Sequence, residues 1–357
     1  MDVSVLGATG DVGRQVCTQL VERALLPATS RLQLVGRADG ASAKATYGLR
    51  ADLIDAYDEH APIIDVALDP ADVVADVVVV AAGRTQPPDG ESFERSHLAA
   101  DNAAVFEAYA DALAEHGSGS EVVIVVTNPV ELGVAILAAR LGRERVIGMG
   151  AWLDTLRFRR EVAVSLGVRR HRVGGFVGGE HGPGTVPLWS SVRVGGLEAG
   201  ERARAVARVR GPRSLDDFPA EVAAAQARLA ELDTADGYRF VDTLPPDLRV
   251  VVRPYLTHRS GAKTAAGTAS ATIDLIDTIL DGRDIVVAGQ VALDGEIALA
   301  GEPVRGVLGV PVQLGPEGWT RVLLDQPTPD EERMLAAVSS SVSAAVAAWT
   351  PRREAGA

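Results

Sequence analysis

Cysteine is nearly missing from this chain, which has 357 residues and a single thiol, at Cys17. One thiol cannot form a disulfide within the chain, and it cannot build a zinc site from cysteine ligands. The sequence therefore excludes a disulfide-stabilised domain. We expect a reducing, cytoplasmic compartment and no bound metal.

Long hydrophobic runs and a basic surface are missing as well. The longest apolar stretches, such as "VVADVVVVAAG", are shorter than the roughly 20 residues that a membrane helix needs. The opening "MDVSVLGATG" lacks the basic start of a secretory signal. The net charge of -13 argues against nucleic acid or an anionic membrane as a partner, since either favours a basic face. We expect a soluble protein that binds small molecules.

Aromatic residues supply only 4% of the chain, whereas apolar residues of all kinds supply 47%. The interior is therefore expected to consist mainly of Ala, Val, Leu and Ile. A chain of 357 residues is long for a single core, which favours two domains.

The order of patterns along the chain supports that division. In residues 1–148, short apolar runs such as "VSVLG" and "VVVVAAG" alternate with helical periods, which indicates a parallel sheet with crossover helices. In residues 149–357, helical segments are mixed with runs such as "DIVVAGQVAL" that are typical of antiparallel strands. The predicted fold class is α/β, with a Rossmann-type parallel sheet domain followed by an α+β catalytic domain with antiparallel strands.

A glycine pattern separates the first predicted strand from the first predicted helix. In "VSVLGATGDVGRQV", Gly7, Gly10 and Gly13 have the spacing that allows a tight turn and brings a helix N-terminus to a pyrophosphate. Because the pattern follows a strand and opens an alternating β/α run, we expect a dinucleotide site. The neighbouring Asp11 is unusual, since an acid repels phosphate, and we expect it to cap the helix or to face solvent.

The end of the second strand bears on which dinucleotide binds. NAD sites usually end this strand with an acid that binds the ribose hydroxyls, but this chain has Gly36 followed by Arg37. Arg37 is able to form a charge-assisted pair with a 2′-phosphate, so we predict NADP, with NAD as the alternative cofactor. The other interpretation of Arg37 is a solvent-facing arginine. The expected cofactor-binding residues are Gly7, Thr9, Gly10, Asp11, Val12, Gly13, Gly36, Arg37, Ala82, Gly83 and Asn102.

Four further patterns place polar residues where chemistry is expected. Asn128 ends a strand in "VVTNPV", and Arg95 follows a Gly/Pro-rich loop in "GESFERSHLAADN". Asp154 and Arg157 lie three residues apart in "AWLDTLRFR", so they share one face of a helix. His181 lies in "GGEHGPG", where glycines leave room for a substrate. Each pattern alone has an ordinary alternative: a cap, a solvated side chain, a helix salt bridge or a turn.

Together, and in this order after a glycine turn, the patterns resemble the lactate/malate dehydrogenase family. The segments "TNPV", "LDTLRF", "GEHG" and "GVPVQLG" carry the resemblance, and "GRADGASAKATYGLRADLIDA" is most similar to the NADP-using malate dehydrogenases of methanogenic archaea. The resemblance implies an NAD(P)-dependent L-2-hydroxy acid dehydrogenase of the malate or lactate type. It also implies a homodimer or homotetramer and a small 2-oxo or 2-hydroxy acid as substrate.

The resemblance assigns a role to each site residue. His181 would protonate the developing alkoxide, and Asp154 would hold its ring and raise its pKa. Arg157 would bind the substrate carboxylate through two parallel hydrogen bonds, and Arg95 would polarise the carbonyl from a mobile loop. The expected catalytic residues are thus His181, Asp154, Arg157 and Arg95, and the expected substrate-binding residues are Asn128, Gln86 and Thr264.

The loop before Arg95, "GRTQPPDGESFER", is longer than in the family. Its substrate-selecting position is Gln86 when counted forward and Asp89 when counted backward. Neither residue is the arginine that pairs with malate's second carboxylate, although Arg84 is close in sequence. The sequence therefore leans slightly away from malate.

Two other features depart from the family pattern. Pro183 stands where the family usually has an acid or an amide, which puts the hydrogen bonding of the turn around His181 in question. Residues 233–260 form an atypical insertion, and its His258 either reshapes substrate choice or belongs to a surface excursion.

Two other functions fit parts of the sequence. A non-catalytic NADP-binding paralogue would keep the glycine turn, but the intact set of catalytic residues argues against it. A nucleotide-dependent glycosidase of similar fold needs a metal site that contains cysteine, and Cys17, inside the first predicted helix, is poorly placed for one.

Overall fold

The computed structural model describes residues 1–85 and 95–350. In chain order, its strands are β1 (Val3–Leu6), β2 (Arg31–Val35), β3 (Ile63–Ala67), β4 (Val77–Val80), β5 (Val122–Val125), β6 (Val146–Gly148), β7 (Val173–Gly179), β8 (Thr185–Val194), β9 (Ile285–Leu299), β10 (Glu302–Gly315) and β11 (Gly318–Val322). Its helices are α1 (Asp11–Glu22), α2 (Gly40–Tyr57), α3 (Arg95–His116), α4 (Val130–Leu141), α5 (Gly150–Leu166), α6 (Ala199–Arg210), α7 (Phe218–Ala230), α8 (Thr234–Thr243), α9 (Pro246–Arg259), α10 (Ala265–Leu280) and α11 (Pro329–Trp349).

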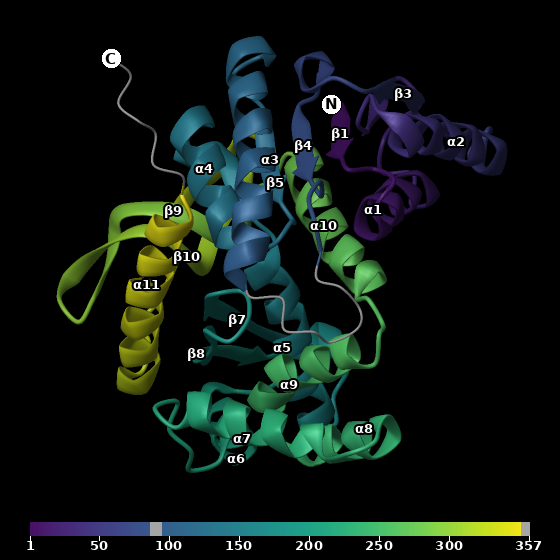
Figure 1. Ribbon diagram of the computed structural model, residues 1–357. Coiled ribbons are helices and arrows are strands. Elements are labelled where there is room, and N and C mark those ends of the chain that lie inside the picture. The colour runs from purple at the N-terminus through teal and green to yellow at the C-terminus, as the bar shows by residue number, and fades with distance from the viewer. Residues whose placement is uncertain (86–94, 351–357) are drawn as a thin grey trace.

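The first six strands form a parallel sheet in the order β3-β2-β1-β4-β5-β6. Their apolar runs are continuous because helices cover both faces of the sheet. In β4, Val77 and Val79 belong to the core shared with α1, whereas Val78 and Val80 belong to the core shared with α3 and α4. Helices α3 and α4 pack side by side over β5 (Figure 1). The Rossmann-type part of the predicted fold is confirmed.

Antiparallel strands extend the same sheet. Strand β6 pairs with β9 at Gly148 and Gln290, and the sheet continues through β10 and β7 to β8. Strands β9 and β10 form a long hairpin that stands out beside α11 (Figure 1). This confirms the antiparallel part of the predicted fold. The division into domains at residue 148 stays a prediction, because the sheet and one hydrophobic core run across it.

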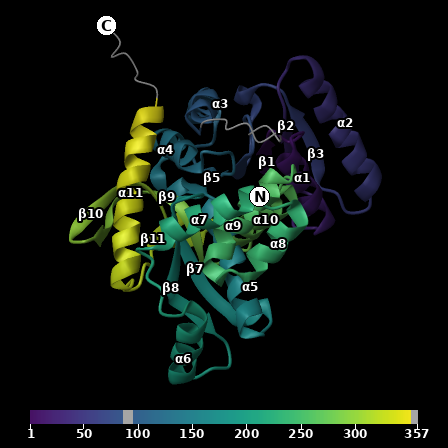
Figure 2. The same ribbon diagram turned by 60° about the horizontal axis from the view of Figure 1, so that its bottom comes forward.

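Residues 233–260, the atypical insertion, fold into α8 and α9, and α9 packs against α5 and α7. Figure 2 shows α9 between α7 and α8, with α6 apart from them at the lower end. Arg249 and Arg253 of α9 reach the buried carboxylate of Glu161 on α5, at N···O distances of 3.1 and 3.4 Å. The surface-excursion interpretation is therefore wrong for α9, whose inner face is part of the packed interior.

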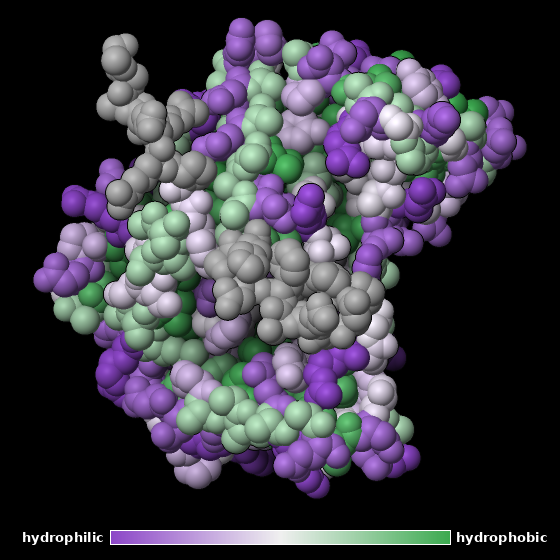
Figure 3. All heavy atoms as spheres, in the orientation of Figure 1, coloured by the Kyte–Doolittle hydropathy of each residue, from purple (hydrophilic) through white to green (hydrophobic). Residues whose placement is uncertain are grey.

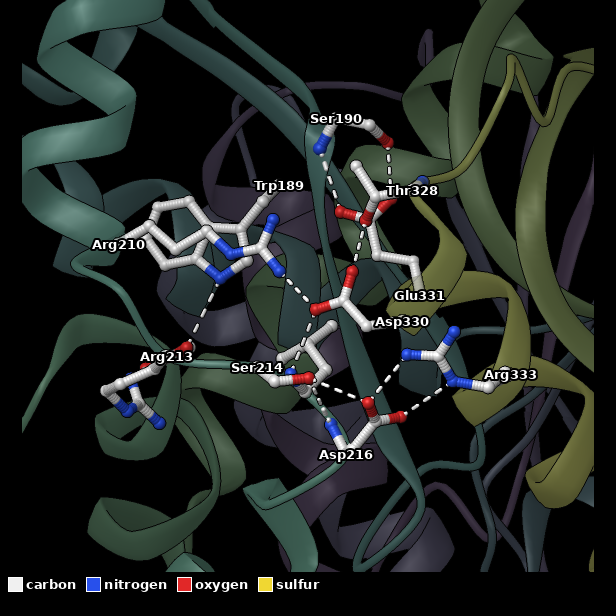
Figure 4. A network of polar contacts seen from close by, with 12 residues as sticks. Trp189, Ser190, Arg210, Arg213, Ser214, Asp216, Thr328, Asp330, Glu331 and Arg333 are labelled. Carbon is white, nitrogen blue, oxygen red and sulfur yellow. Dashed lines mark hydrogen bonds and ion pairs between the residues drawn. The ribbon is translucent and has the colours of Figure 1, made fainter.

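A polar network joins the start of α11 to β8 and to the connection between α6 and α7 (Figure 4). Glu331 is fully buried and accepts hydrogen bonds from the backbone N–H of Ser190, at 2.9 Å, and from its hydroxyl, at 2.6 Å. Asp330 pairs with Arg210 at the end of α6. Because a buried carboxylate is costly without partners, these contacts fix where α11 begins.

The first turn of α9 belongs to the same network. The buried carboxylate of Asp247 accepts hydrogen bonds from the indole N–H of Trp189, at 3.2 Å, and from Arg213, at 2.8 Å. Helix α9 is thus anchored at its start by β8 and in its middle by α5.

On the face drawn in Figure 3, hydrophobic colour is spread in small areas between hydrophilic side chains. Within residues 1–85 and 95–350, no helix is long and apolar enough to cross a membrane.

Replacing Glu161 with Ala should lower the free energy of unfolding by about 3–5 kcal/mol, because Arg249 would be left buried without its counter-charge. Urea denaturation followed by circular dichroism measures the change. Glu231→Ala is the matched control, since its pair with Arg228 is exposed and should contribute less than about 1 kcal/mol. Equal losses in the two variants would contradict the structural role of Glu161.

Candidate active site

The turn between β1 and α1 has the shape that the glycine pattern predicts. Gly7 has φ 77°, and a Cβ there would lie 2.7 Å from Cα of Ala82. A Cβ on Gly13 would lie 2.2 Å from the carbonyl oxygen of Gly7, so α1 packs directly on the turn. Helix α1 begins immediately after Gly10, and the N–H groups of its first turn attract phosphate. This bare backbone fits the pyrophosphate of a dinucleotide.

Asp11 is exposed at the start of α1 and forms an ion pair with Lys263, which lies just before α10. The cap position belongs to Gly10, so the capping interpretation of Asp11 is wrong and the solvent-facing one holds. Thr9 and Val12 are half-buried in the same turn. The ion pair offsets the negative charge near the glycine turn and joins the start of α1 to the segment before α10.

The loops that follow β4 and β5 are held together by Asn102. Its amide accepts a hydrogen bond from the N–H of Arg84, at 2.7 Å, and donates one to the carbonyl of Asn128, at 2.7 Å. A Cβ on Gly83 would lie 2.8 Å from the Oδ1 atom of Asn102. Asn102 is fully buried, whereas Asn128 is exposed just after the end of β5.

The end of β2 has no room for an acid at residue 36. A Cβ on Gly36 would lie 2.2 Å from the hydroxyl oxygen of Thr46 on α2. The side chain of Arg37 is 80% exposed, and its Nε lies 3.7 Å from a carboxylate oxygen of the equally exposed Asp39. The backbone N–H of Arg37 donates to the hydroxyl of Ser42, at 3.0 Å, which fixes the chain direction.

A cluster of polar contacts joins α5 to the loop after β7. Nδ1 of His181 lies 2.7 Å from Oδ2 of Asp154, and Nη1 of Arg157 donates to Oδ1 of Asp154 at 3.0 Å. The side chain of Asp154 is 6% exposed, and those of His181 and Arg157 are each 17% exposed. Three residues predicted from two separate motifs are therefore in one largely buried cluster.

The charges in this cluster set the pKa values of its members. Burial acts to lower the pKa of His181, but the nearby Asp154 carboxylate and its hydrogen bond outweigh that effect. Glu131 also acts to raise the pKa, so the pKa of His181 is raised overall. Burial likewise acts to raise the pKa of Asp154, but His181 and Arg157 keep it lowered. Both shifts favour the charged forms of the pair, an imidazolium beside a carboxylate.

Sequence reasoning missed two residues that hold His181. A Cβ on Gly150, the first residue of α5, would lie 2.5 Å from Cβ and Cγ of His181, so the ring packs directly on bare backbone. Glu131 accepts the backbone N–H of His181 at 2.7 Å. The available signals were weak, because they were only a glycine opening "GAWLDTLRF" and an acid after "TNPV".

The turn that carries His181 is well hydrogen-bonded despite Pro183. Gly184 donates its N–H to a carboxylate oxygen of Glu180 at 3.1 Å. The Thr185 hydroxyl donates to the carbonyl of Gly182 at 2.8 Å. The polar group that Pro183 removes is therefore replaced by neighbours in the turn.

The last turn of α9 lies beside this cluster. Arg253 of α9 pairs with Glu161 of α5. His258 stands about one turn after Arg253, and Arg157 stands about one turn before Glu161, so His258 and Arg157 lie at the same level. The pKa of His258 is lowered, first by partial removal of water and then by the positive charges of Arg157 and His181. The atypical segment thus contributes a side chain to the electrostatics of the site.

The remaining site predictions lie at the edge of the cleft or outside the described residues. Arg95 is the first residue of α3 and its side chain, like Gln86, is outside the described part. Thr264 is half-buried immediately before α10. Arg84 is exposed and pairs with Asp101 at 3.0 Å.

Cys17 is not placed as a metal ligand. It is fully buried in α1, and burial raises its pKa to about 12. Across residues 1–85 and 95–350, no group of three or more His, Cys, Asp or Glu residues is arranged to bind a metal ion. The cysteine that the glycosidase alternative needs is therefore unavailable to a metal.

Residues 1–148 match the model of the lactate/malate dehydrogenase NAD binding domain. The malate dehydrogenase of Halobacterium salinarum is 30% identical to this chain over 348 residues, which make up 96% of this chain and 97% of the relative. The chain belongs to the lactate/malate dehydrogenase family. The resemblance identified from "TNPV", "LDTLRF" and "GEHG" is confirmed.

Other members of the family are similar over nearly their whole length. The malate dehydrogenase of Methanothermobacter marburgensis is 30% identical over 91% of each chain. The L-2-hydroxycarboxylate dehydrogenase (NAD(P)(+)) of Methanocaldococcus jannaschii is 27% identical over 93% of each chain. This chain is therefore an oxidoreductase of the 2-hydroxy acid dehydrogenase type with a nicotinamide cofactor.

Solved structures of the family have the same fold. The lactate dehydrogenase of Cryptosporidium parvum, crystallised with lactic acid and nicotinamide adenine dinucleotide, aligns with a TM-score of 0.74 at 21% identity, covering 99% of this chain and 98% of that one. The malate dehydrogenase of Aeropyrum pernix aligns with a TM-score of 0.72 at 21% identity, covering 98% and 100%.

Replacing Asp154 with Asn should move the pKa of His181 from above 6.5 to below 6.5. The raising effect of the carboxylate would be lost, while burial and the charge of Arg157 would still lower the pKa. NMR titration of the labelled histidine rings measures both values, with the His181 signal assigned by its loss in His181→Asn. An unchanged pKa would show that Asp154 does not control this ring.

Proposed function

We propose that this dehydrogenase reversibly interconverts an L-2-hydroxy acid and its 2-oxo acid, with His181 as the acid/base group and with NADP(H) preferred over NAD(H). The observation that carries the proposal is the 2.7 Å contact between Nδ1 of His181 and Asp154 in a largely buried cluster. A buried histidine with a raised pKa beside a carboxylate is suited to give and take a proton near neutral pH.

The glycine turn at Gly7 to Gly13 would hold the pyrophosphate of the cofactor. When bound, the nicotinamide supplies or accepts the hydride. Because Asp154 holds Nδ1 of His181, the other ring nitrogen, Nε2, is the atom that exchanges a proton with the substrate oxygen. The carboxylate of Asp154 stabilises the imidazolium before the proton is given to the developing alkoxide.

The other residues would bind and orient the acid. Arg157 would bind the substrate carboxylate, because its guanidinium is partly exposed and already held on one side by Asp154. Asn128 and Thr264 would line the pocket. Arg95 would polarise the carbonyl, as the family motif implies.

The expected substrate range follows from the charges that are available for a second carboxylate. Gln86 and Asp89 carry no positive charge, Arg84 is engaged with Asp101, and the pKa of His258 is lowered. We therefore expect a 2-oxo acid without a second carboxylate as substrate, because none of these side chains is available as a positively charged partner for a second one. Oxaloacetate remains a substrate to test, since several relatives are malate dehydrogenases.

Support for NADP(H) comes from the end of β2. A side chain at Gly36 is blocked by Thr46, so no acid is there to bind ribose hydroxyls or to repel a 2′-phosphate. The exposed pair of Arg37 with Asp39 contributes about 0–1 kcal/mol and is easily replaced. A phosphate dianion is a stronger partner for the guanidinium.

We also propose a homodimer or homotetramer and a cytoplasmic compartment. The family resemblance supports the assembly, and the single buried thiol suits a reducing environment.

Replacing His181 with Ala should lower turnover of the best 2-oxo acid by at least about 100-fold, because the general acid is lost. The assay follows NADPH absorbance with pyruvate, oxaloacetate and bulkier 2-oxo acids. A loss of only a few-fold would remove His181 from the acid/base role. Wild-type protein that oxidised NADPH with none of these acids would favour the non-catalytic alternative.

Replacing Arg37 with Ala should raise KM for NADPH roughly 10- to 100-fold, because a hydrogen bond between charged groups contributes about 1.5–3 kcal/mol. KM for NADH should stay within about two-fold, since NADH has no 2′-phosphate to lose. Arg31→Ala, at the other end of β2, is the control and should change neither constant. A wild-type preference for NADH would refute the NADP(H) proposal.

A further inference from the structure

Glu131 is a buried carboxylate that the roles assigned so far do not include. It lies in the first turn of α4 and is only 1% exposed. Its Oε1 atom accepts the backbone N–H of His181 at 2.7 Å, across 50 residues of sequence. An ionised group in such a place is costly unless hydrogen bonds and nearby positive charge compensate it.

The fold explains why this carboxylate reaches the histidine. Strand β5 ends in the loop that carries Asn128, and α4 starts directly after it. An acid in the first turn of a helix is stabilised by the positive end of the helix dipole. The turn after β7 then presents the N–H of His181 to that acid.

His181 is therefore held by three contacts from two elements. The ring nitrogen Nδ1 is bound by Asp154, the ring packs on the bare backbone of Gly150, and the main chain is bound by Glu131. The contacts to Asp154 and Gly150 come from α5, whereas the contact to Glu131 comes from α4. The hydrogen bond to Glu131 thus holds His181 through an element other than α5.

We propose that Glu131 is a positioning residue for proton transfer, which holds the main chain of His181 and supplies a second negative charge that favours its protonated form. The inference rests on the proposed function and deepens it. Among the described residues, the charged or titratable groups that act on His181 are Asp154 and Arg157 from α5, Glu131 from α4 and His258 from α9. The positive charge of Arg157 disfavours protonation of His181, whereas the carboxylates of Asp154 and Glu131 favour it.

Glu131→Gln separates the two parts of this role. The amide oxygen of glutamine still accepts the N–H of His181, but the charge is lost. The inflection of kcat/KM against pH for 2-oxo acid reduction should move to lower pH by about half a pH unit or more, because the imidazolium is less favoured. The rate below that inflection should stay within about three-fold of wild type, since geometry is kept.

Glu131→Asp tests the other part. The shorter side chain keeps the charge but cannot reach the N–H without movement of the turn. It should lower kcat about ten-fold or more at every pH, while the inflection changes little, because proton transfer depends on placement. Glu331→Gln is the matched control, since Glu331 is equally buried and lies in the network at the start of α11. It should leave the inflection unmoved.

NMR titration of the His181 ring reads the charge effect without relying on turnover. A lower pKa in Glu131→Gln than in wild type supports the proposal, and an identical pKa overturns it. If the wild-type protein reduced no 2-oxo acid, the proposed function would fail, yet the titration would still decide whether Glu131 controls His181. An inflection that moved as far in Glu331→Gln as in Glu131→Gln would also overturn the inference.

Discussion

The bond between Asp154 and His181 is the interaction on which the rest of the site depends. Burial alone would leave the imidazole neutral, and the carboxylate beside it reverses that tendency. The bond requires the turn after β7 to pack directly against the start of α5. Only glycine leaves room for this at residue 150, since a Cβ there would clash with His181. The same contact fixes the ring and sets its charge. Glu131 adds a second carboxylate, which holds the main chain of His181 instead of its ring.

Helix α5 connects this bond to the remainder of the chain. Its first turns carry Asp154 and Arg157, and the next turn carries Glu161, which binds two arginines of α9. The start of α9 is held by Trp189 of β8, next to the network at the start of α11. The cluster of His181, Asp154 and Arg157 is therefore joined to a frame of buried ion pairs, in which an unpaired charge is costly. That frame fixes the position of the last turn of α9, which carries His258.

The strands, the glycine turn and three residues of the candidate site could be predicted from the sequence. Contacts between residues distant in sequence could not, for a physical reason. Runs such as "VVVV" at β4 and the turn at Gly7 are local patterns, and locally determined geometry is readable from them. His181, Asp154 and Arg157 were also predicted, because each stands in a distinctive motif. The contact of Glu131 with His181, the closure of position 36 by Thr46 and the burial of α9 all join residues distant in sequence. No periodicity records such contacts, since they depend on how whole elements pack. For the same reason, the sequence left open whether "DTADGYRFVDTLPPDLRVVVRPYLTHRS" reshapes substrate choice or is a surface excursion. Three of its charged residues, Asp247, Arg249 and Arg253, are paired against the core.

The continuous sheet has a consequence for motion between the parallel and antiparallel strands. Strand β6 is hydrogen-bonded to β9, and the fully buried Gln290 of β9 also accepts the N–H of Ala151 at 3.0 Å. A rotation of the parallel strands against the antiparallel strands would break this pairing and expose the core that both share. The continuous sheet therefore opposes such a hinge motion.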